Sequence, residues 1–367
     1  MLRRRILAMA TTTGLLCPIA CSSESSVVPQ PAPIDTHAFD LPRTFDAGST
    51  GPTEKERALA TTYTGGLASP GFSQVTALLA TDVHFAFPGL DDGRGREAAA
   101  RWHEALFGAF DGRVVAPSRI FRTAGTQTIE WTFSGKQARD WMGVAATGKP
   151  VTFQGATILW TRDDGSIVDI HTYFDVAVVK AQLGAGPPEL ASLPVPAAPT
   201  GAPQVVEQQN TPVEASNVAA VHASLDAFEK PDSVPYLDTL TDDIEILNPA
   251  RATPARGKAD AKTTFTAMHK AIGSLDSIVD NAWGIERDVV VEYSLNGPQS
   301  GPLGWVPARA DRPIDLKVLD VVELHDGKLA KIWRYTNPAQ ILTAGGAPPA
   351  LQPADAGADA SRRTPHR

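Results

Sequence analysis

The chain has 367 residues, of which 43% are hydrophobic and 20% are charged, and its formal net charge is −8. The length predicts two domains of ordinary size, and the composition is that of a protein able to bury a core. The acidic balance argues against a nucleic-acid partner, because phosphate binding needs a basic face.

The N-terminal segment has the layout of a secretory signal, with arginines at positions 3–5 followed by an apolar run over 6–20. That run is too short to span a membrane as a helix. Both cysteines of the chain, Cys17 and Cys21, lie here. Cleavage before Cys21 would leave a mature chain with one thiol, at its first residue. The arrangement resembles that of bacterial lipoproteins, which implies a signal peptide over 1–20 and lipidation of Cys21.

The expected location is therefore the cell envelope, with the membrane contacted only through the N-terminal lipid anchor. A secreted or periplasmic soluble protein is the alternative. Because the rest of the chain has no cysteine pair, neither a disulfide framework nor a cysteine-rich metal site is available to it.

Residues 21–52 are rich in Ser, Pro, Thr and Gly, which predicts a disordered tether. The block that follows, 53–185, opens with helical patterns. Apolar residues recur at helical spacing over 54–67, and an Arg-Gly-Arg turn at 94–96 leads into a second helix with one apolar stripe. The stripe consists of Trp102, Leu106 and Phe110.

The same block ends in strands. Alternating runs with β-branched and aromatic residues occupy 128–133, 151–161 and 167–174, and a hairpin turn is predicted at Asp163-Asp164-Gly165. Helices followed by a run of antiparallel strands predict an α+β fold, with the helices on one face of a curved sheet.

A proline-rich segment over 186–212 predicts a semi-extended linker, and residues 345–367 predict a disordered tail. Between them, 213–344 looks like a copy of the first block. The Arg-Gly turns begin at Arg94 and Arg256, and 256 − 94 gives an offset of 162. The same offset relates three further pairs of segments: Glu130–Phe133 with Glu292–Leu295, Asp164-Gly165 with Asp326-Gly327, and Tyr173–Asp175 with Tyr335–Asn337. A duplication is the economical interpretation.

The first block resembles the SnoaL-like polyketide cyclase, or ester cyclase, family of the nuclear transport factor 2-like superfamily. Three runs carry the resemblance: Gly95–Ala98, Trp141–Val151 with its Thr147-Gly148-Lys149, and Asp164–Val168 leading into Tyr173-Phe174-Asp175. The second block keeps the opening turn, the hairpin and Trp333, but Gly304–Pro307 lacks the Thr-Gly-Lys run, so it resembles a diverged copy.

The resemblance implies two tandem cone-shaped domains, each a curved antiparallel sheet wrapped by N-terminal helices around an apolar pocket. It implies no metal and no organic cofactor. Because relatives commonly dimerise through the sheet, it also implies that the two domains pack on each other as an internal pseudo-dimer. Family members cyclise, isomerise or only bind, so the fold alone fixes no function.

The last strand of the first block places four polar groups on one face: Asp169, His171, Tyr173 and Asp175. If this face lines the pocket, burial raises the pKa of a carboxyl there and makes it a general acid or base. The resemblance points to Asp175 or Asp169 as that group, with His171 and Tyr173 orienting or donating. The alternative is a solvated outer face, with Ile170, Thr172 and Phe174 in the core.

The remaining candidates for the pocket are aromatic or neutral: Trp102, Trp141, Trp333, Tyr335 and Asn337. The second block has Asn337 where the first has Asp175, and an amide cannot accept a proton at neutral pH. The second domain is therefore expected to pack, bind or support. Glu245 and Glu323 are interpreted as surface strand residues.

His84, on a strand, and His103, on a helix, have no second ligand at metal spacing in the sequence, so no metal site is predicted. We expect the protein to bind an apolar small molecule in the pocket of the first domain. The alternative is a cofactor-independent cyclase or isomerase that uses a pocket aspartate as general acid/base.

Overall fold

The structure is a computed structural model that describes residues 54–310 and 312–343. The expected signal peptide, the lipidation site Cys21, the tether over 21–52 and the tail over 345–367 lie outside the described residues. Among the described residues, no helix is both long and apolar enough to cross a membrane.

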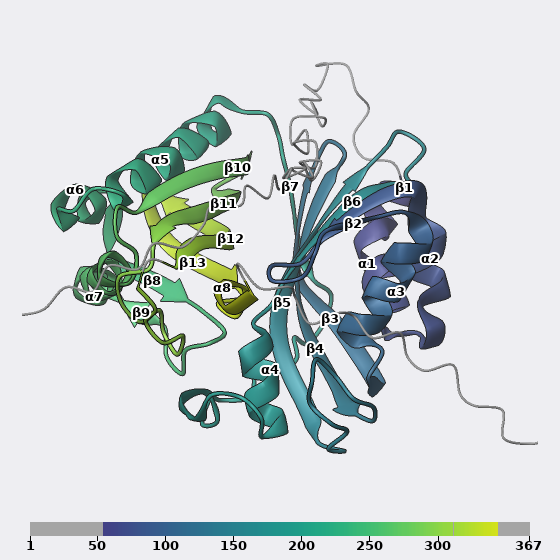
Figure 1. The fold of residues 1–367 in the computed structure, drawn as a ribbon. Coiled ribbons are helices and arrows are strands. Elements are labelled where there is room, and N and C mark those ends of the chain that lie inside the picture. The colour runs from purple at the N-terminus through teal and green to yellow at the C-terminus, as the bar shows by residue number, and fades with distance from the viewer. Residues whose placement is uncertain (1–53, 311, 344–367) are drawn as a thin grey trace, which may run out of the picture. The chain divides into compact units, whose positions relative to one another are not determined.

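The first domain opens with helices and continues as a sheet (Figure 1). Its helices are α1 (Glu54–Ala68), α2 (Ser73–Leu78), α3 (Arg96–Phe107) and α4 (Val176–Leu183), with a short 3₁₀ helix at Pro70–Phe72. Its strands are β1 (Leu79–Ala86), β2 (Gly93–Arg94), β3 (Phe110–Thr123), β4 (Thr126–Gln137), β5 (Pro150–Thr161), β6 (Ile167–Tyr173) and, beyond a 3₁₀ helix at Pro188–Leu190, β7 (Gln204–Glu207).

The second domain repeats this order. Its helices are α5 (Pro212–Phe228), α6 (Ser233–Asp238), α7 (Gly257–Ala271) and α8 (Gln340–Thr343). Its strands are β8 (Leu240–Leu247), β9 (Ala255–Arg256), β10 (Asp276–Ile285), β11 (Asp288–Pro298), β12 (Pro313–His325) and β13 (Lys328–Thr336). The chain is thus two tandem α+β domains, as the repeated landmarks predict.

Local chemistry explains several boundaries. The β5–β6 turn closes on Gly165, which adopts a positive φ of 77°, while the Asp164 carboxylate accepts from the Ser166 N–H at 2.7 Å. Helix α5 starts at a capping box, in which Thr211 and Glu214 satisfy each other's backbone N–H groups. Helix α3 ends at Phe107, one turn earlier than its apolar stripe suggests. Phe110 therefore begins β3, where it is still fully buried.

The sheets are mixed rather than purely antiparallel. The strand orders are β2-β1-β6-β5-β4-β3-β7 and β10-β11-β12-β13-β8-β9. The run from β3 to β6 is antiparallel as expected, but β1 pairs parallel with β6, and β8 pairs parallel with β13. In each domain the first strand thus pairs with a strand from near the end of the domain sequence. The alternation of side chains along a strand does not indicate whether such a pair is parallel or antiparallel.

The linker expected as a semi-extended spacer over 186–212 contains a strand. Residues 204–207 include two valines and no proline, and they pair parallel with β3 as strand β7. Val206 is buried by this pairing. The linker thus adds an edge strand to the first sheet.

Each domain has its own core between sheet and helices. Helices α1 to α3 cover one face of the first sheet, and α5 to α7 cover one face of the second (Figure 1). The space inside the first domain is filled by aromatic rings that contact one another: Phe107, Trp131, Phe133, Phe153 and Phe174. A separate buried cluster contains side chains from the other faces of both sheets, including Ile158 and Tyr173 with Val321 and Tyr335.

Candidate functional site

Strand β6 places Asp169, His171 and Tyr173 on one face, but that face does not line the interior of the first domain. Ile170 and Phe174, at the alternate positions, belong to the core beneath the helices. Tyr173 belongs to the cluster shared with the second sheet. The expectation of a pocket face is therefore wrong, because alternation fixes which residues share a face and not which face is concave. Nor is it a fully solvated outer face, because the second domain covers part of it and leaves Asp169 and His171 only 17% and 20% exposed.

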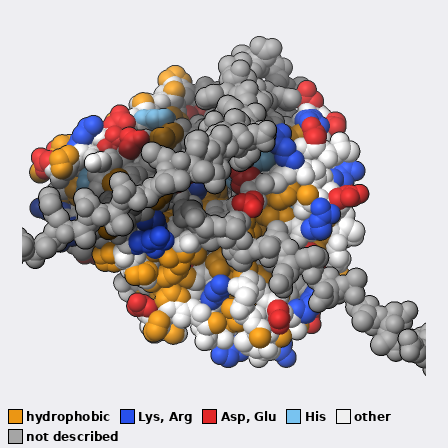
Figure 2. Space-filling view, viewed as in Figure 1, with side chains coloured by type: hydrophobic (Ala, Val, Ile, Leu, Met, Phe, Trp, Pro, Cys, Tyr) orange, Lys and Arg blue, Asp and Glu red, His pale blue; other side chains and the backbone are white. Residues whose placement is uncertain are grey.

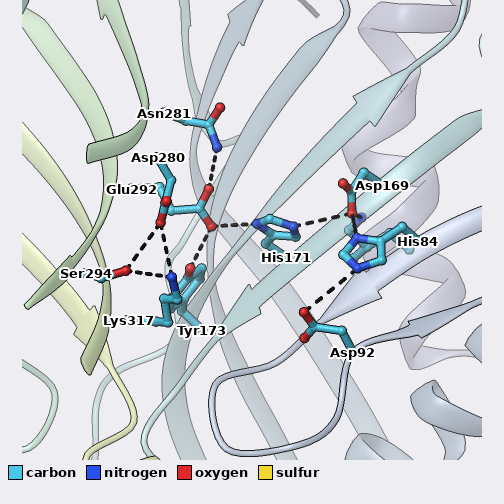
Figure 3. A network of polar contacts seen from close by, with 11 residues as sticks. His84, Asp92, Asp169, His171, Tyr173, Asp280, Asn281, Glu292, Ser294 and Lys317 are labelled. Carbon is cyan, nitrogen blue, oxygen red and sulfur yellow. Dashed lines mark hydrogen bonds and ion pairs between the residues drawn. The ribbon is translucent and has the colours of Figure 1, made fainter. Parts of the chain in front are cut away.

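A carboxylate of the second domain, Glu292 on β11, accepts from both His171 and Tyr173 (Figure 3). Its Oε1 lies 2.6 Å from His171 Nδ1 and 2.6 Å from the Tyr173 hydroxyl. Its Oε2 accepts from the Asn281 amide at 2.7 Å. Burial alone would raise the pKa of Glu292, but the His171 charge and these donors outweigh burial and lower it. Glu292 is therefore a buried, ionised and fully hydrogen-bonded group.

Asp169 lies between two imidazoles. Its Oδ1 is 2.7 Å from His84 Nδ1 and 3.4 Å from His171 Nε2. Burial would raise the pKa of Asp169, yet the bonds to His171 and His84 hold it well below its usual range. Burial likewise opposes the charge on His171, but Glu292 and Asp169 raise its pKa well above the usual value. Without another ligand, His171 is an imidazolium between two carboxylates.

His84 reaches this cluster because β1 and β6 are parallel neighbours whose register sets His84 beside Asp169. The other ring nitrogen of His84 faces Asp92, with Nε2 3.9 Å from Oδ2 (Figure 3). The sequence predicted His84 to be structural because no second ligand lies near it in the chain. Its hydrogen-bond partner, Asp169, is 85 residues away in sequence, so only the pairing of β1 with β6 reveals it.

The same contacts recur with the roles of the domains exchanged. The Tyr335 hydroxyl donates to Glu130 Oε1 at 2.7 Å, and Arg119 NH2 donates to the same oxygen at 2.8 Å. Adding the offset of 162 to residues 119, 130 and 173 gives 281, 292 and 335. The bonds Tyr173–Glu292 and Asn281–Glu292 are thus the counterparts of Tyr335–Glu130 and Arg119–Glu130. Reciprocal pairs of this kind are the mark of a two-fold, isologous contact.

Two residues of this contact were singled out by sequence only as repeat landmarks. Glu130 and Glu292 each lie in the middle of a strand whose residues are buried on both faces. A carboxylate at such a position needs a partner, and its occurrence at both equivalent positions was the signal for a shared polar contact.

Asp175 does not join the other three predicted residues. It is the N-cap of α4, where its Oδ1 accepts from the Ala177 N–H at 2.8 Å. Its Oδ2 is buried and has no hydrogen-bond partner among the described residues. Burial raises the pKa of Asp175 to about 6, although backbone N–H groups of Ala177 and Val178 oppose the shift. Asn337, the equivalent residue, donates to the Pro88 carbonyl at 2.7 Å and accepts from the Val176 N–H at 3.3 Å.

The predicted pocket tryptophans of the first domain are core residues. Trp102 packs against Phe85 with ring centroids 5.2 Å apart, and Trp141 donates its indole N–H to the Leu106 carbonyl at 2.9 Å. Both side chains are almost fully buried. They therefore fill the interior where a pocket was expected.

A cavity of about 320 Å³ lies elsewhere, between strands of both domains and the linker. Its wall is mostly apolar and includes two predicted pocket residues, Trp333 and Tyr335. The lining residues are Phe153, Gln154, Val178, Pro194, Val195, Pro196, Ala197, Leu247, Asn248, Pro249, Arg251, Pro254, Trp333, Arg334 and Tyr335. The space-filling view shows hydrophobic side chains gathered over the region where α4 lies in Figure 1 (Figure 2).

Trp333 is the counterpart of His171 at the same offset and stacks against Arg119, whose guanidinium carbon lies 3.4 Å from the ring centroid. Arg334 is held by Asp320, with NH2 2.7 Å from Oδ2. Arg251 is exposed, and its guanidinium bonds only weakly to Thr264 at 3.3 Å. Arg251 is thus the cationic group of the cavity wall best able to meet an anionic substituent.

Comparisons with known proteins match each domain separately. The model described as the SnoaL-like domain matches residues 60–170 and again 221–332. A candidate SnoaL-like polyketide cyclase from Jannaschia sp. CCS1 aligns at 24% identity with a TM-score of 0.34, over 39% of this chain and 99% of its own. A candidate polyketide cyclase from Streptomyces antibioticus aligns at 22% identity with a TM-score of 0.32, over 36% of this chain and 99% of its own. An LEH-like epoxide hydrolase from M. tuberculosis aligns at 18% identity with a TM-score of 0.30, over 36% of this chain and 91% of its own. A search of the curated proteins finds no significant match.

Proposed function

Because the chain belongs to the SnoaL-like family, whose domain it contains twice, we propose that it binds an apolar small molecule and that the cavity shared by the two domains is the binding site. The observation that carries the proposal is the position of the cavity. The interior of the first domain, where the sequence analysis placed the ligand, is occupied by packed aromatic rings. A space of ligand size that the structure does describe is the cavity of about 320 Å³ beside Trp333 and Tyr335.

The size and chemistry of this cavity suit a compact ligand. Small-molecule sites are typically about 300–1,000 Å³, mostly apolar, and common at domain interfaces. Phe153, Val178, Leu247 and Trp333 supply apolar surface, and Arg251 supplies a cation at the wall. A planar apolar molecule with one acidic substituent satisfies both features.

The test is a titration with 1-anilinonaphthalene-8-sulfonate, an apolar fluorophore with one anionic group. The Ala197→Trp variant places an indole at the cavity wall and is expected to weaken binding at least about tenfold. Ala146→Trp, at an exposed loop position of the first domain, is the matched control and is expected to bind as the unaltered chain does. Equal affinity in both variants, or no binding by the unaltered chain, would contradict the proposal. Native mass spectrometry of the purified protein tests for a retained ligand.

A cofactor-independent cyclase or isomerase is the second candidate, and one observation favours it. Asp175 combines a pKa of about 6 with a buried Oδ2 that no described residue hydrogen-bonds, which suits a general base near neutral pH. Asp175 does not line the cavity, however, so we place this activity second. Exchange of the α-protons of cyclohexanone in D₂O measures it. Exchange that the unaltered chain catalyses and Asp175→Asn does not would support an enzyme. Exchange at the uncatalysed rate with the unaltered chain would rule out this activity.

We further propose that the protein is exported and anchored in the cell envelope through a lipid on Cys21, which the N-terminal sequence supports. Metabolic labelling with palmitate is expected to mark the unaltered protein and not Cys21→Ser. The variant is also expected to leave the membrane fraction. An unlabelled protein recovered only in the soluble fraction would favour the secreted or periplasmic alternative.

A further inference from the structure

Three side chains on neighbouring strands direct donor atoms at one another outside the proposed ligand cavity. His84 comes from β1, and Asp169 and His171 come from β6. One ligand atom from each lies within 4.8 Å of the other two. Two imidazoles and a carboxylate are a donor set that zinc and related transition metals prefer.

The distances are close to those that a bound ion requires. Zinc bonds of about 2.0–2.1 Å in a tetrahedron separate neighbouring ligand atoms by about 3.3 Å. His171 Nε2 and Asp169 Oδ1 are 3.4 Å apart, whereas His84 Nδ1 and Asp169 Oδ1 are 2.7 Å apart. A shift of roughly half an ångström at the partly exposed His84 would fit the second pair to the same geometry.

A second observation points to the same atoms. A metal-bound histidine usually donates its other ring N–H to a carboxylate, which fixes the ring and its tautomer. His171 Nδ1 bonds Glu292 at 2.6 Å, and His84 Nε2 faces Asp92 at 3.9 Å (Figure 3). His171 therefore has a hydrogen-bonded outer carboxylate on one nitrogen, Asp92 lies beside the corresponding nitrogen of His84, and each ring directs its remaining nitrogen at Asp169.

The site is also open to an ion and to water. The side chains of His84, Asp169 and His171 are 18%, 17% and 20% exposed. A divalent cation would offset two of the three negative charges of Asp169, Glu292 and Asp92. Three protein ligands leave one tetrahedral position for water or for a ligand atom.

The second domain shows that the fold does not itself require this cluster. The pair equivalent to His84 and Asp169 in the β8–β13 register is Glu245 and Lys331, which form an ion pair at 3.2 Å. Trp333 stands in place of His171. The copy thus stabilises the same strand junction with a salt bridge and no imidazole, and a metal site is confined to the first domain.

We propose that His84, Asp169 and His171 bind one divalent transition-metal ion of the zinc class per chain. Glu292 and Asp92 orient the two histidines, so the second domain completes the surroundings of a site whose ligands all come from the first. The site is separate from the small-molecule cavity, none of whose lining residues belongs to it.

The test uses the full-length protein, stripped of metal with a chelator and without a histidine tag, titrated calorimetrically with Zn²⁺ alone. One ion per chain is expected to bind. His84→Ala and Asp169→Asn are each expected to lower the affinity at least about tenfold, and Glu292→Gln about 10–100-fold, as outer-sphere carboxylates do. His222→Ala, which removes an exposed histidine of α5, is the control and is expected to bind normally.

Two further readouts separate a specific site from loss of folding. Zn²⁺ is expected to raise the melting temperature of the unaltered chain and of His222→Ala, and not of His84→Ala, provided that circular dichroism shows His84→Ala to be folded. Co²⁺ is expected to give the visible absorption of a tetrahedral site only where His84 is present. No stoichiometric binding, or equal binding by His84→Ala and Asp169→Asn, would overturn the proposal.

Discussion

Asp175 shows how one buried carboxyl makes stability depend on pH. Its pKa in the folded chain is about 6, against the ordinary value of 3.8 for an aspartate, because burial disfavours the charge. Between these values the native state holds a proton that the unfolded chain has released. Stability therefore falls as pH rises from about 4 to about 6, and outside that window this group adds no further pH dependence.

Replacing Asp175 with Asn removes this pH dependence of stability while keeping a residue that caps helices. We expect the free energy of unfolding of Asp175→Asn, relative to the unaltered chain, to rise by up to about 3 kcal/mol between pH 4 and pH 7. Urea unfolding at both pH values measures the difference. Asp232→Asn, the same exchange at the exposed N-cap of α6, is the control for the cap itself. A difference that does not change with pH would refute the assignment.

Tyr335 and Tyr173 carry the polar part of the contact between the domains. Each donates its hydroxyl to a buried glutamate of the other domain, at 2.7 Å and 2.6 Å. Hydrogen bonds to charged groups contribute about 1.5–3 kcal/mol, so we expect Tyr335→Phe and Tyr173→Phe each to lower the free energy of unfolding by that amount.

Tyr63→Phe is the matched comparison, because its hydroxyl bonds His103 at 3.0 Å within the first core. Burial lowers the pKa of His103 to about 4, so that bond joins two neutral groups at pH 7 and is expected to contribute only about 1 kcal/mol. Chemical denaturation of the three variants measures which of them loses the most free energy of unfolding. A smaller loss for both interdomain variants than for Tyr63→Phe would contradict the stronger hydrogen bonds expected between the domains.

At the scale of elements, the sequence predicted the features that depend on neighbouring residues and missed those that depend on residues far apart in the chain. The periods of α1 and β5 and the turn at Asp164-Gly165 depend on neighbours in the chain, and the structure has them as expected. The parallel pairing of β1 with β6 depends on residues 85 apart, so the partner of His84 had no local signal. The sequence could not show what covers the face of β6 that carries Tyr173 for the same reason, because that face is buried against the second domain.

Strand β7 is a second element that local patterns did not separate from its surroundings. It lies within a proline-rich segment, but its four residues pair with β3 and bury Val206, which is 5% exposed, while Val205 is 43% exposed. We expect Val206→Ala to lower the free energy of unfolding by about 2 kcal/mol through the cavity it leaves. Val205→Ala, its neighbour on the same strand, is expected to change it by less than about 0.5 kcal/mol. Equal effects in urea unfolding would show that the strand does not form.

At the scale of the whole chain, the family and the duplication could be predicted because landmarks at an offset of 162 survive in both domains. The shared contact could not, because its members are scattered over β3, β4, β6 and their counterparts. Those members obey the same offset, which makes the contact reciprocal: Arg119, Glu130 and Tyr173 correspond to Asn281, Glu292 and Tyr335. We propose that the two domains are an internal pseudo-dimer.

An isologous contact is complete with two copies, so the duplicated chain has already used the surface through which a single domain would pair. We therefore expect the full chain to be a monomer whose mass in light scattering is independent of concentration. Residues 54–207 alone would expose Phe121, Ile158 and Trp160 of the shared cluster, and are expected to self-associate. A stable homodimer of the full chain, or a monomeric and soluble first domain, would mean that the contact between the sheets is not the one that duplication replaced.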